Sequence, residues 1–148
     1  MTSDPRDLAK KLKLDDGLGF MARVLAGRAA SAYEELTGQT EITPQQFGVL
    51  LTLFQRGPMT LKEITRATRA DQSTTGEMVR RMGARGLITR AAGEEDRRTV
   101  SIAITDEGAT ALVALVQQMP ALQERMLAPI APEHRRLFLE NLKRLVEL

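Results

Sequence analysis

The fold is decided by residues 71–105, which read DQSTTGEMVRRMGARGLITR (71–90) followed by AAGEEDRRTVSIAIT (91–105). In the first part, Val79 and Met82 are spaced as on one face of a helix, Asp71 is a typical N-cap, and Gly86 suits the left-handed residue after a helix end. In the second part the apolar period falls to two, which predicts two strands at 87–90 and 100–104 joined by a polar loop. A helix followed by a β-hairpin is therefore expected.

Two short helices are predicted upstream of this stretch. Thr43-Pro44-Gln45-Gln46 combines an N-cap threonine, a proline at the first helical position and a glutamine three residues after the cap. We expect the helix that follows to bury Phe47, Leu50, Leu51 and Phe54 and to end at Gly57-Pro58. Thr60-Leu61-Lys62-Glu63 is a second capping box, and it predicts a helix to about Ala67 with Leu61 and Ile64 inward. Three short helices before a hairpin are typical of a winged helix-turn-helix.

Long helices are predicted on both sides of this module. Apolar residues at steps of three and four predict one helix from Leu14 to Leu36, after a polar segment at 1–13 that is expected to be a mobile arm or a frayed first turn. Thr105 caps a second long helix, which Pro120 should kink, and Pro132 starts a last one. The expected fold class is mainly α with a small β-hairpin: one domain, 1–148, with a winged module at 42–104 between helical regions at 8–37 and 105–148. Apolar stripes this long predict a homodimer held by these regions.

Composition excludes several classes of function. The 148 residues contain no cysteine and one histidine, His134, which excludes thiol chemistry and a zinc site built on two or more His or Cys ligands. No apolar run approaches a membrane span, and the start does not look like a secretory signal, so we expect a cytoplasmic protein without membrane contact. The sequence also has no Gly-rich phosphate loop and no Ser-His arrangement with a glycine elbow. No enzyme activity, metal or cofactor is expected.

Positive charge is concentrated in the middle of the chain. Residues 60–100 carry nine basic and six acidic side chains, and six arginines between Arg66 and Arg90 face only Asp71 and Glu77. Clustered arginine is the usual footprint of phosphate binding. The alternative interpretation is a solvated helix face laced with ion pairs.

Six fragments in order carry a family resemblance. They are ITPQQFGVL (42–50), GPMTLKEI (57–64), DQSTT (71–75), RGLITR (85–90), DRR (96–98) and ITDEG (104–108). Together they resemble the MarR family of winged-helix transcriptional regulators. The resemblance implies a homodimeric transcriptional repressor that binds double-stranded DNA and that a small organic ligand releases from the DNA. It also implies a recognition helix at about 71–85 and a wing at 91–99. Gly76-Glu77 and Arg80-Arg81 depart from the pattern of many members, so base contacts are not carried over there.

The expected DNA contacts follow from a helix N-terminus placed in the major groove and a hairpin tip in the minor groove. Gln72, Ser73, Thr74 and Thr75 are the candidates for base edges, although Ser73 is equally suited to capping. Arg80, Arg81 and Arg85 suit phosphates, as do Thr60 and Lys62 at the start of the preceding helix. Arg97 and Arg98 suit a narrow minor groove. By resemblance, Asp96 orients a neighbouring arginine.

The effector site is predicted from the resemblance, which places it where the first, second and fifth helices meet the DNA-binding module. The candidate lining residues are Phe20, Met21, Arg23, Arg28, Tyr33 and Phe47, of which Phe20 and Phe47 also suit plain core. Arg23 and Arg28 can hold a carboxylate or phosphate, so aromatic acids and coenzyme A thioesters are the expected ligands. A protein-interaction module is the alternative function, because winged helices also serve as assembly platforms.

Overall fold

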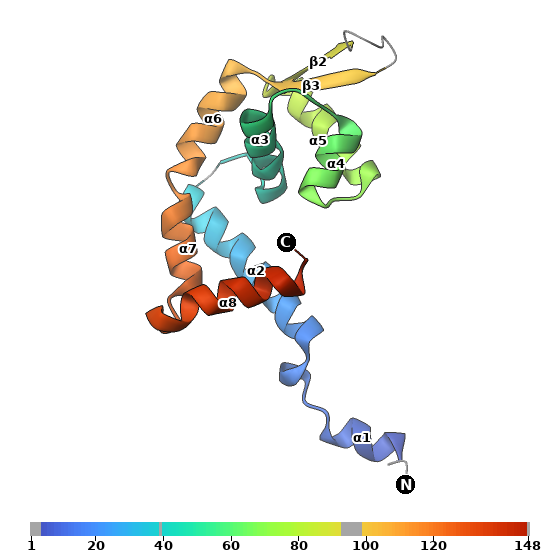
Figure 1. Ribbon diagram of the computed structural model, residues 1–148, viewed down its shortest axis with the longest axis vertical. Coiled ribbons are helices and arrows are strands. Elements are labelled where there is room, and N and C mark those ends of the chain that lie inside the picture. The colour runs from blue at the N-terminus through green and yellow to red at the C-terminus, as the bar shows by residue number, and fades with distance from the viewer. Residues whose placement is uncertain (1–3, 39, 93–98, 148) are drawn as a thin grey trace. The chain divides into compact units, whose positions relative to one another are not determined.

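The computed structural model describes residues 4–38, 40–92 and 99–147 (Figure 1). Its helices are α1 (Pro5–Lys11), α2 (Leu18–Thr37), α3 (Pro44–Arg56), α4 (Leu61–Thr68), α5 (Gln72–Ala84), α6 (Asp106–Val116), α7 (Met119–Leu127) and α8 (Pro132–Leu145), with a 3-10 turn, η1, at Leu14–Asp16. Its strands are β1 (Met59–Thr60), β2 (Ile88–Ala92) and β3 (Val100–Ile104). The mainly helical class with a small β-hairpin is confirmed.

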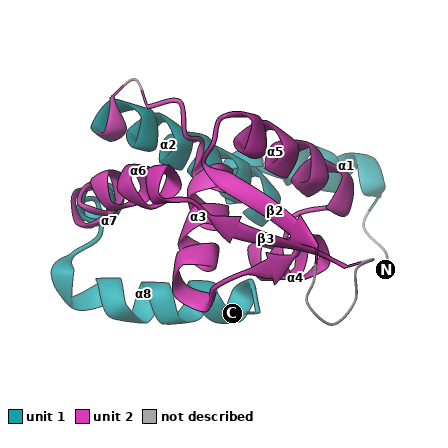
Figure 2. Ribbon diagram, turned by 90° about the horizontal axis from the view of Figure 1, so that it is seen from above, with its two compact units in different colours: residues 1–36, 122–148 teal, residues 37–121 magenta. Residues whose placement is uncertain are grey.

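The chain divides into two compact units, coloured separately in Figure 2. One comprises residues 1–36 and 122–148 and holds α1, α2 and α8; the other comprises 37–121 and holds α3 to α6 with the sheet. Residues 105–148 are predicted to belong with the flanking helices, whereas α6 lies in the second unit. The reason is that Leu112 and Leu115 of α6 are buried in the core of that unit.

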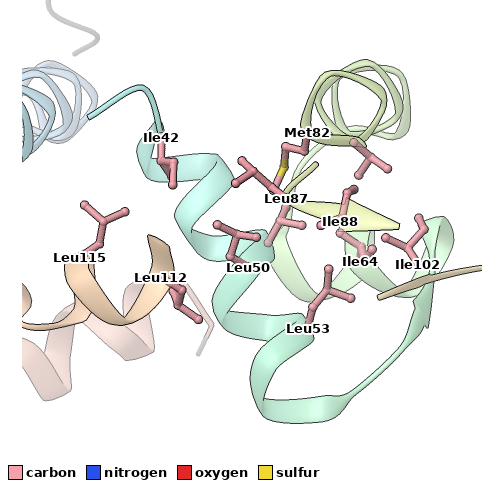
Figure 3. Close-up of a cluster of buried hydrophobic side chains, with 12 residues drawn as sticks. Ile42, Leu50, Leu53, Ile64, Met82, Leu87, Ile88, Ile102, Leu112 and Leu115 are labelled. Carbon is pink, nitrogen blue, oxygen red and sulfur yellow. The ribbon is translucent and has the colours of Figure 1, made fainter. Parts of the chain in front are cut away.

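The core of the second unit is drawn in Figure 3. Every element of the unit except β1 contributes a side chain to it, and those that are almost completely buried include Val49, Leu50, Leu53, Ile64, Val79, Met82, Ile102 and Leu112. The prediction for α3 was wrong in part, because Phe54 is 53% exposed while Val49 and Leu53 are buried. Successive residues are about 100° apart on a helix, so the observed face is turned by one residue from the expected one.

The sheet has three strands in the order β1-β3-β2, both pairs antiparallel, rather than the two strands of a simple hairpin. The additional strand is β1, where Met59 lies opposite Ile102 and Thr60 opposite Ser101. A strand of two residues is too short to show a periodicity of two, so no pattern in the sequence predicts it. It brings the start of α4 to the edge of the hairpin.

The predicted helix starts are confirmed in detail. Thr43 and Thr60 form full capping boxes with Gln46 and Glu63, and Asp71 and Thr105 each accept a hydrogen bond from the backbone N–H three residues on. Gly86 has a φ of 71°, as predicted for a left-handed residue after a helix, and Gly57, which ends α3 as predicted, has a φ of 82°. These residues fix the starts of α4 and α5 and the end of α5, the helices that carry the candidate site.

The flanking regions differ from the predictions at three places. Residues 5–11 form a separate helix, α1, capped by Asp4 with Pro5 at the first position, where a mobile arm or a frayed first turn was expected. The helix predicted from Leu14 is interrupted at Gly17, where η1 ends before α2. The long helix after Thr105 breaks between Val116 and Met119 instead of kinking at Pro120. Pro120 is the second residue of α7, where the absent N–H would have had no helical partner anyway.

The close approach of α6 to Leu87 provides a test of the packing. A Cβ on Gly108 would lie 2.1 Å from the Leu87 carbonyl oxygen and 2.9 Å from Cγ1 of Ile104. We expect Gly108→Ala to lower the free energy of unfolding by about 3 kcal/mol, because neither backbone segment can move aside cheaply. Gly48→Ala is the control: it is also inside a helix, nothing lies within 4 Å of its added Cβ, and alanine should leave stability equal or higher. Urea denaturation at matched protomer concentration measures both, and equal midpoints would contradict the contact.

Candidate nucleic-acid interface

The candidate interface is the exposed face of α5. One face of this helix buries Thr75, Val79 and Met82 in the core of the second unit. At about 100° per residue, Ser73, Glu77 and Arg80 project from the opposite face, and all three are exposed. Because α4, a turn and α5 pack together and Asp71 fixes where α5 begins, this exposed face is presented by a rigid support.

The first turn of α5 presents short polar side chains to solvent. Gln72, Ser73 and Thr74 are exposed, as the sequence analysis requires of residues that reach base edges. Asp71 caps the helix, and its Oδ1 accepts a hydrogen bond of 2.8 Å from the Thr74 backbone N–H. Hydrogen bonds from the Thr74 side chain and then from its backbone hold the pKa of Asp71 below its usual value. Thr74 therefore shares in the cap, while Gln72 and Ser73 of the same turn are exposed.

Thr75 is a correction to the predicted contacts. Its side chain is fully buried, and its hydroxyl donates a hydrogen bond of 2.8 Å to the Asp71 carbonyl oxygen. The residue lies on the core face of α5, nearly half a turn from Ser73 and Glu77 on the exposed face. Thr75 is therefore a packing residue, and it is left out of the interface proposed below.

Arg80 and Arg81 converge on one carboxylate. Arg80 donates to Glu77 through Nε (3.0 Å, to Oε2) and NH2 (2.8 Å, to Oε1), and Arg81 Nε donates to Oε1 at 2.9 Å. These hydrogen bonds, first from Arg80 and then from Arg81, lower the pKa of Glu77 to about 2. In the sequence, Glu77 stands out only as a departure from the family pattern. The signal was nevertheless present, because spacings of three and four place acidic and basic side chains side by side on a helix.

Arg85 lies just beyond α5 and is bonded within the second unit. Its NH1 donates to the Glu41 carbonyl oxygen at 2.9 Å and its NH2 to the Glu41 carboxylate at 3.2 Å. The side chain is 34% exposed, against 64% and 67% for Arg80 and Arg81. The contact joins the end of α5 to the segment that precedes α3, so Arg85 has a structural role beside any contact with phosphate.

The start of α4 presents the two other predicted phosphate contacts. The Thr60 hydroxyl donates to Glu63 Oε2 at 2.9 Å and accepts from the Glu63 backbone N–H at 3.3 Å, so it is occupied by the cap. Lys62 is exposed on the outer side of the same turn. The predicted wing residues Asp96, Arg97 and Arg98 lie outside the described residues, whereas the strands that lead to them, β2 and β3, are in place.

The predicted effector residues fall in both units. On α2, the Arg23 guanidinium lies 5.2 Å from the centre of the Phe20 ring, a cation–π arrangement. Met21 and Arg28 are exposed on the same helix, while Tyr33 is 4% exposed and burial raises the pKa of its hydroxyl. Phe47 belongs to the second unit, where it packs half-buried against the core. The structure thus brings together Phe20 and Arg23.

Within residues 4–38, 40–92 and 99–147, no group of three or more His, Cys, Asp or Glu side chains is placed to hold a metal ion. None of the helices in those ranges combines the length and the apolar character needed to cross a bilayer.

Comparison with known proteins gives the family. The model of the MarR family matches residues 42–100. The organic hydroperoxide resistance transcriptional regulator of Bacillus subtilis is 34% identical over 98 residues, which are 66% of this chain and 67% of that protein. The HTH-type transcriptional repressor NicR of Pseudomonas putida is 26% identical over 130 residues, covering 88% and 82% of the two chains.

Two solved structures show the same fold. BpsR of Bordetella bronchiseptica, studied for the regulation of its DNA binding by 6-hydroxynicotinic acid, superposes with a TM-score of 0.86 at 22% identity over 93% of this chain and 98% of that one. The transcriptional repressor CouR, bound to a 23-mer DNA duplex, superposes with a TM-score of 0.82 at 23% identity over 92% and 99%. At these identities the likeness is one of fold.

The cap of α5 gives a pH-dependent prediction. Because the folded pKa of Asp71 lies below its usual 3.8, the ionised cap contributes stability above pH 3.8 that is lost as the pH falls through the folded pKa. We expect Asp71→Ala to lower the urea midpoint at pH 7, with the difference from wild type narrowing below pH 3.8. Asp71→Ser keeps a neutral cap, so its stability relative to Asp71→Ala should not depend on pH. A constant difference between wild type and Asp71→Ala from pH 7 to pH 2 would contradict the role of the charge.

Proposed function

The chain belongs to the MarR family, and on that basis we propose that it is a homodimeric, sequence-specific regulator of transcription, most simply a repressor that an organic ligand releases from its operator. The observation that carries the proposal is the exposed first turn of α5, where Gln72 and Ser73 project from a helix held on a packed module. Glutamine pairs bidentately with adenine, and serine donates to or accepts from base edges. The fold shared with the DNA-bound repressor CouR supports this use of α5.

Phosphate contacts complete the proposed binding mode. Lys62 on α4 and Arg80 and Arg81 on α5 are exposed, and we assign them to the backbone on either side of the groove. Arg97 and Arg98 at the wing are proposed to enter the minor groove on the strength of the family resemblance, which also implies that Asp96 orients a neighbouring arginine. Such contacts position the helix on the duplex, while the first turn of α5 reads the bases.

The first unit supports a dimer. Large apolar side chains along residues 12–25 and on α8 are exposed in the isolated chain, among them Leu12, Leu14, Leu18, Met21, Leu137 and Leu145. A second copy of the chain is the proposed cover, since exposed apolar surface of this extent favours association. Two-fold symmetry then presents two α5 helices to half-sites one turn of DNA apart. We place the protein in the cytoplasm with its DNA.

An aromatic acid or a coenzyme A thioester is the proposed effector. BpsR is regulated by an aromatic acid, 6-hydroxynicotinic acid, and the Arg23–Phe20 pair on α2 offers a cation beside an aromatic ring, which suits a ligand of that chemistry. One relative is named for organic hydroperoxide resistance. This sequence contains no cysteine, so oxidation of its own thiol is not a route to release.

Selection of genomic DNA fragments tests the regulator function. We expect the bound fragments to share an inverted repeat with half-sites about 10 base pairs apart. Scrambling one half-site should weaken binding at least about tenfold at 150 mM salt, since each mismatched pair costs about 1–3 kcal/mol. Light scattering on the same sample should give the mass of two chains. Equal affinity for selected and scrambled duplexes would instead favour the protein-interaction module.

A thermal-shift assay tests the effector. With 6-hydroxynicotinic acid and benzoyl-coenzyme A as probes, we expect one of them to raise the melting temperature, because a ligand at 100 times its Kd stabilises by about 2.7 kcal/mol. Arg23→Gln should lose this shift while keeping the melting temperature of the unliganded protein. Arg56→Gln, an exposed arginine at the end of α3, is the control and should retain the shift. Identical shifts in both variants would remove Arg23 from the site.

A further inference from the structure

Glu77 occupies the centre of the exposed face of α5. It lies four residues after Ser73 and opposite the residues that α5 buries, so it is directed where the proposed function puts the duplex. An acidic side chain there is repelled by phosphates. Its position between two arginines that bind to it therefore calls for an explanation beyond ordinary surface pairing.

We infer that Glu77 is a specificity-determining residue. Its carboxylate accepts hydrogen bonds from Arg80 and Arg81, and this restrains both guanidiniums from binding the phosphates of unrelated duplexes. The inference rests on the proposed function, because it concerns the same helix face. Three hydrogen bonds of 2.8–3.0 Å hold the cluster, and they use both Nε atoms as well as NH2 of Arg80. The three side chains together carry a net charge of +1, whereas the two arginines alone would carry +2.

The physical basis is the difference between unspecific and specific binding. Attraction between arginines and phosphates supplies nearly all of the affinity for unrelated DNA, and it does not depend on sequence. A regulator gains specificity when its affinity for unrelated DNA falls by a larger factor than its affinity for the operator. A carboxylate beside the arginines has this effect, because it offers no favourable contact to phosphate, while in the major groove it can accept a hydrogen bond from the cytosine amino group.

The strength of the cluster suits this role. The side chains of Glu77, Arg80 and Arg81 remain 47%, 64% and 67% exposed, so water screens the pairing and the arginines can exchange partners. A buried cluster would withhold the arginines from every duplex. An exposed cluster lowers the free energy gained from an arginine–phosphate contact. It still allows the arginines to bind the operator when the first turn of α5 contacts the operator's bases.

The test is the binding of Glu77→Gln to an unrelated duplex over a range of salt concentrations. We expect tighter binding than wild type and a steeper log–log salt slope, by about 0.9 for each guanidinium that gains a phosphate. The ratio of operator to unrelated affinity should fall. The control is Glu107→Gln, which removes one negative charge at an exposed position in the first turn of α6. If affinity and salt slope rose as much in Glu107→Gln as in Glu77→Gln, the effect would be one of net charge and the inference would be overturned. An unchanged salt slope in Glu77→Gln would also overturn it.

A second comparison assigns the effect to the arginines. In an Arg80→Gln, Arg81→Gln background, adding Glu77→Gln should bring a much smaller rise in affinity and slope, because only the repulsion between the carboxylate and the phosphates is lost and no guanidinium is left to release. A rise of the same size in that background would also overturn the inference.

Melting curves should show all variants folded, since the exchanged side chains are exposed. If the wild type has no preferred operator, the proposed function fails, while the measurements on unrelated duplex still decide the role of Glu77.

Discussion

The junction between the end of α5, the start of β2 and the start of α6 determines how the candidate interface is held. Gly86 turns the chain with a positive φ, the Thr105 hydroxyl donates to the Gly86 carbonyl oxygen at 2.6 Å, and the Thr105 N–H donates to the Leu87 carbonyl oxygen at 3.1 Å. Gly108 lets α6 approach Leu87 closely. These contacts join the helix proposed to read the groove to the hairpin that carries the wing, so both are presented to a duplex as one body.

Local signals in the sequence predict the elements of this body well. Caps at Thr43, Thr60, Asp71 and Thr105 and the left-handed glycines depend on interactions within three or four residues, so they can be predicted before the fold is known. The rotation of α3 cannot, because residues 47/50/51/54 and residues 49/50/53 are both apolar sets at helical spacing, and only packing against α4, α6 and the sheet selects between them. The same limit applies to β1, whose pairing with β3 is a long-range contact.

The candidate site divides in the same way. The exposed first turn of α5 follows from its predicted start, and the burial of Thr75 follows from the same helix geometry once the core face is known. The ion-pair partners of the arginines, in contrast, do not follow from the count of charges in the sequence. Counting charges indicates an excess of positive charge around α5, but only side-chain geometry shows that Arg80 and Arg81 share Glu77 while Arg85 is bonded to Glu41. The net charge around α5 therefore overstates the number of arginine side chains that are available, without an ion-pair partner, to contact a duplex.

The two departures from the family pattern at Gly76 and Glu77 have different consequences, although they are adjacent. A Cβ on Gly76 would lie 3.6 Å from Cδ2 of Leu61, so this position faces α4, and the missing side chain takes nothing from the exposed face. Glu77 is one residue further round the helix and lies at the centre of that face. An added Cβ at Gly76 would make only an ordinary van der Waals contact with α4, so packing does not require glycine there, and packing does not explain Glu77 either, whose partners are the two exposed arginines. A difference in DNA recognition between this chain and its relatives is accordingly expected to arise from Glu77, Arg80 and Arg81 rather than from Gly76.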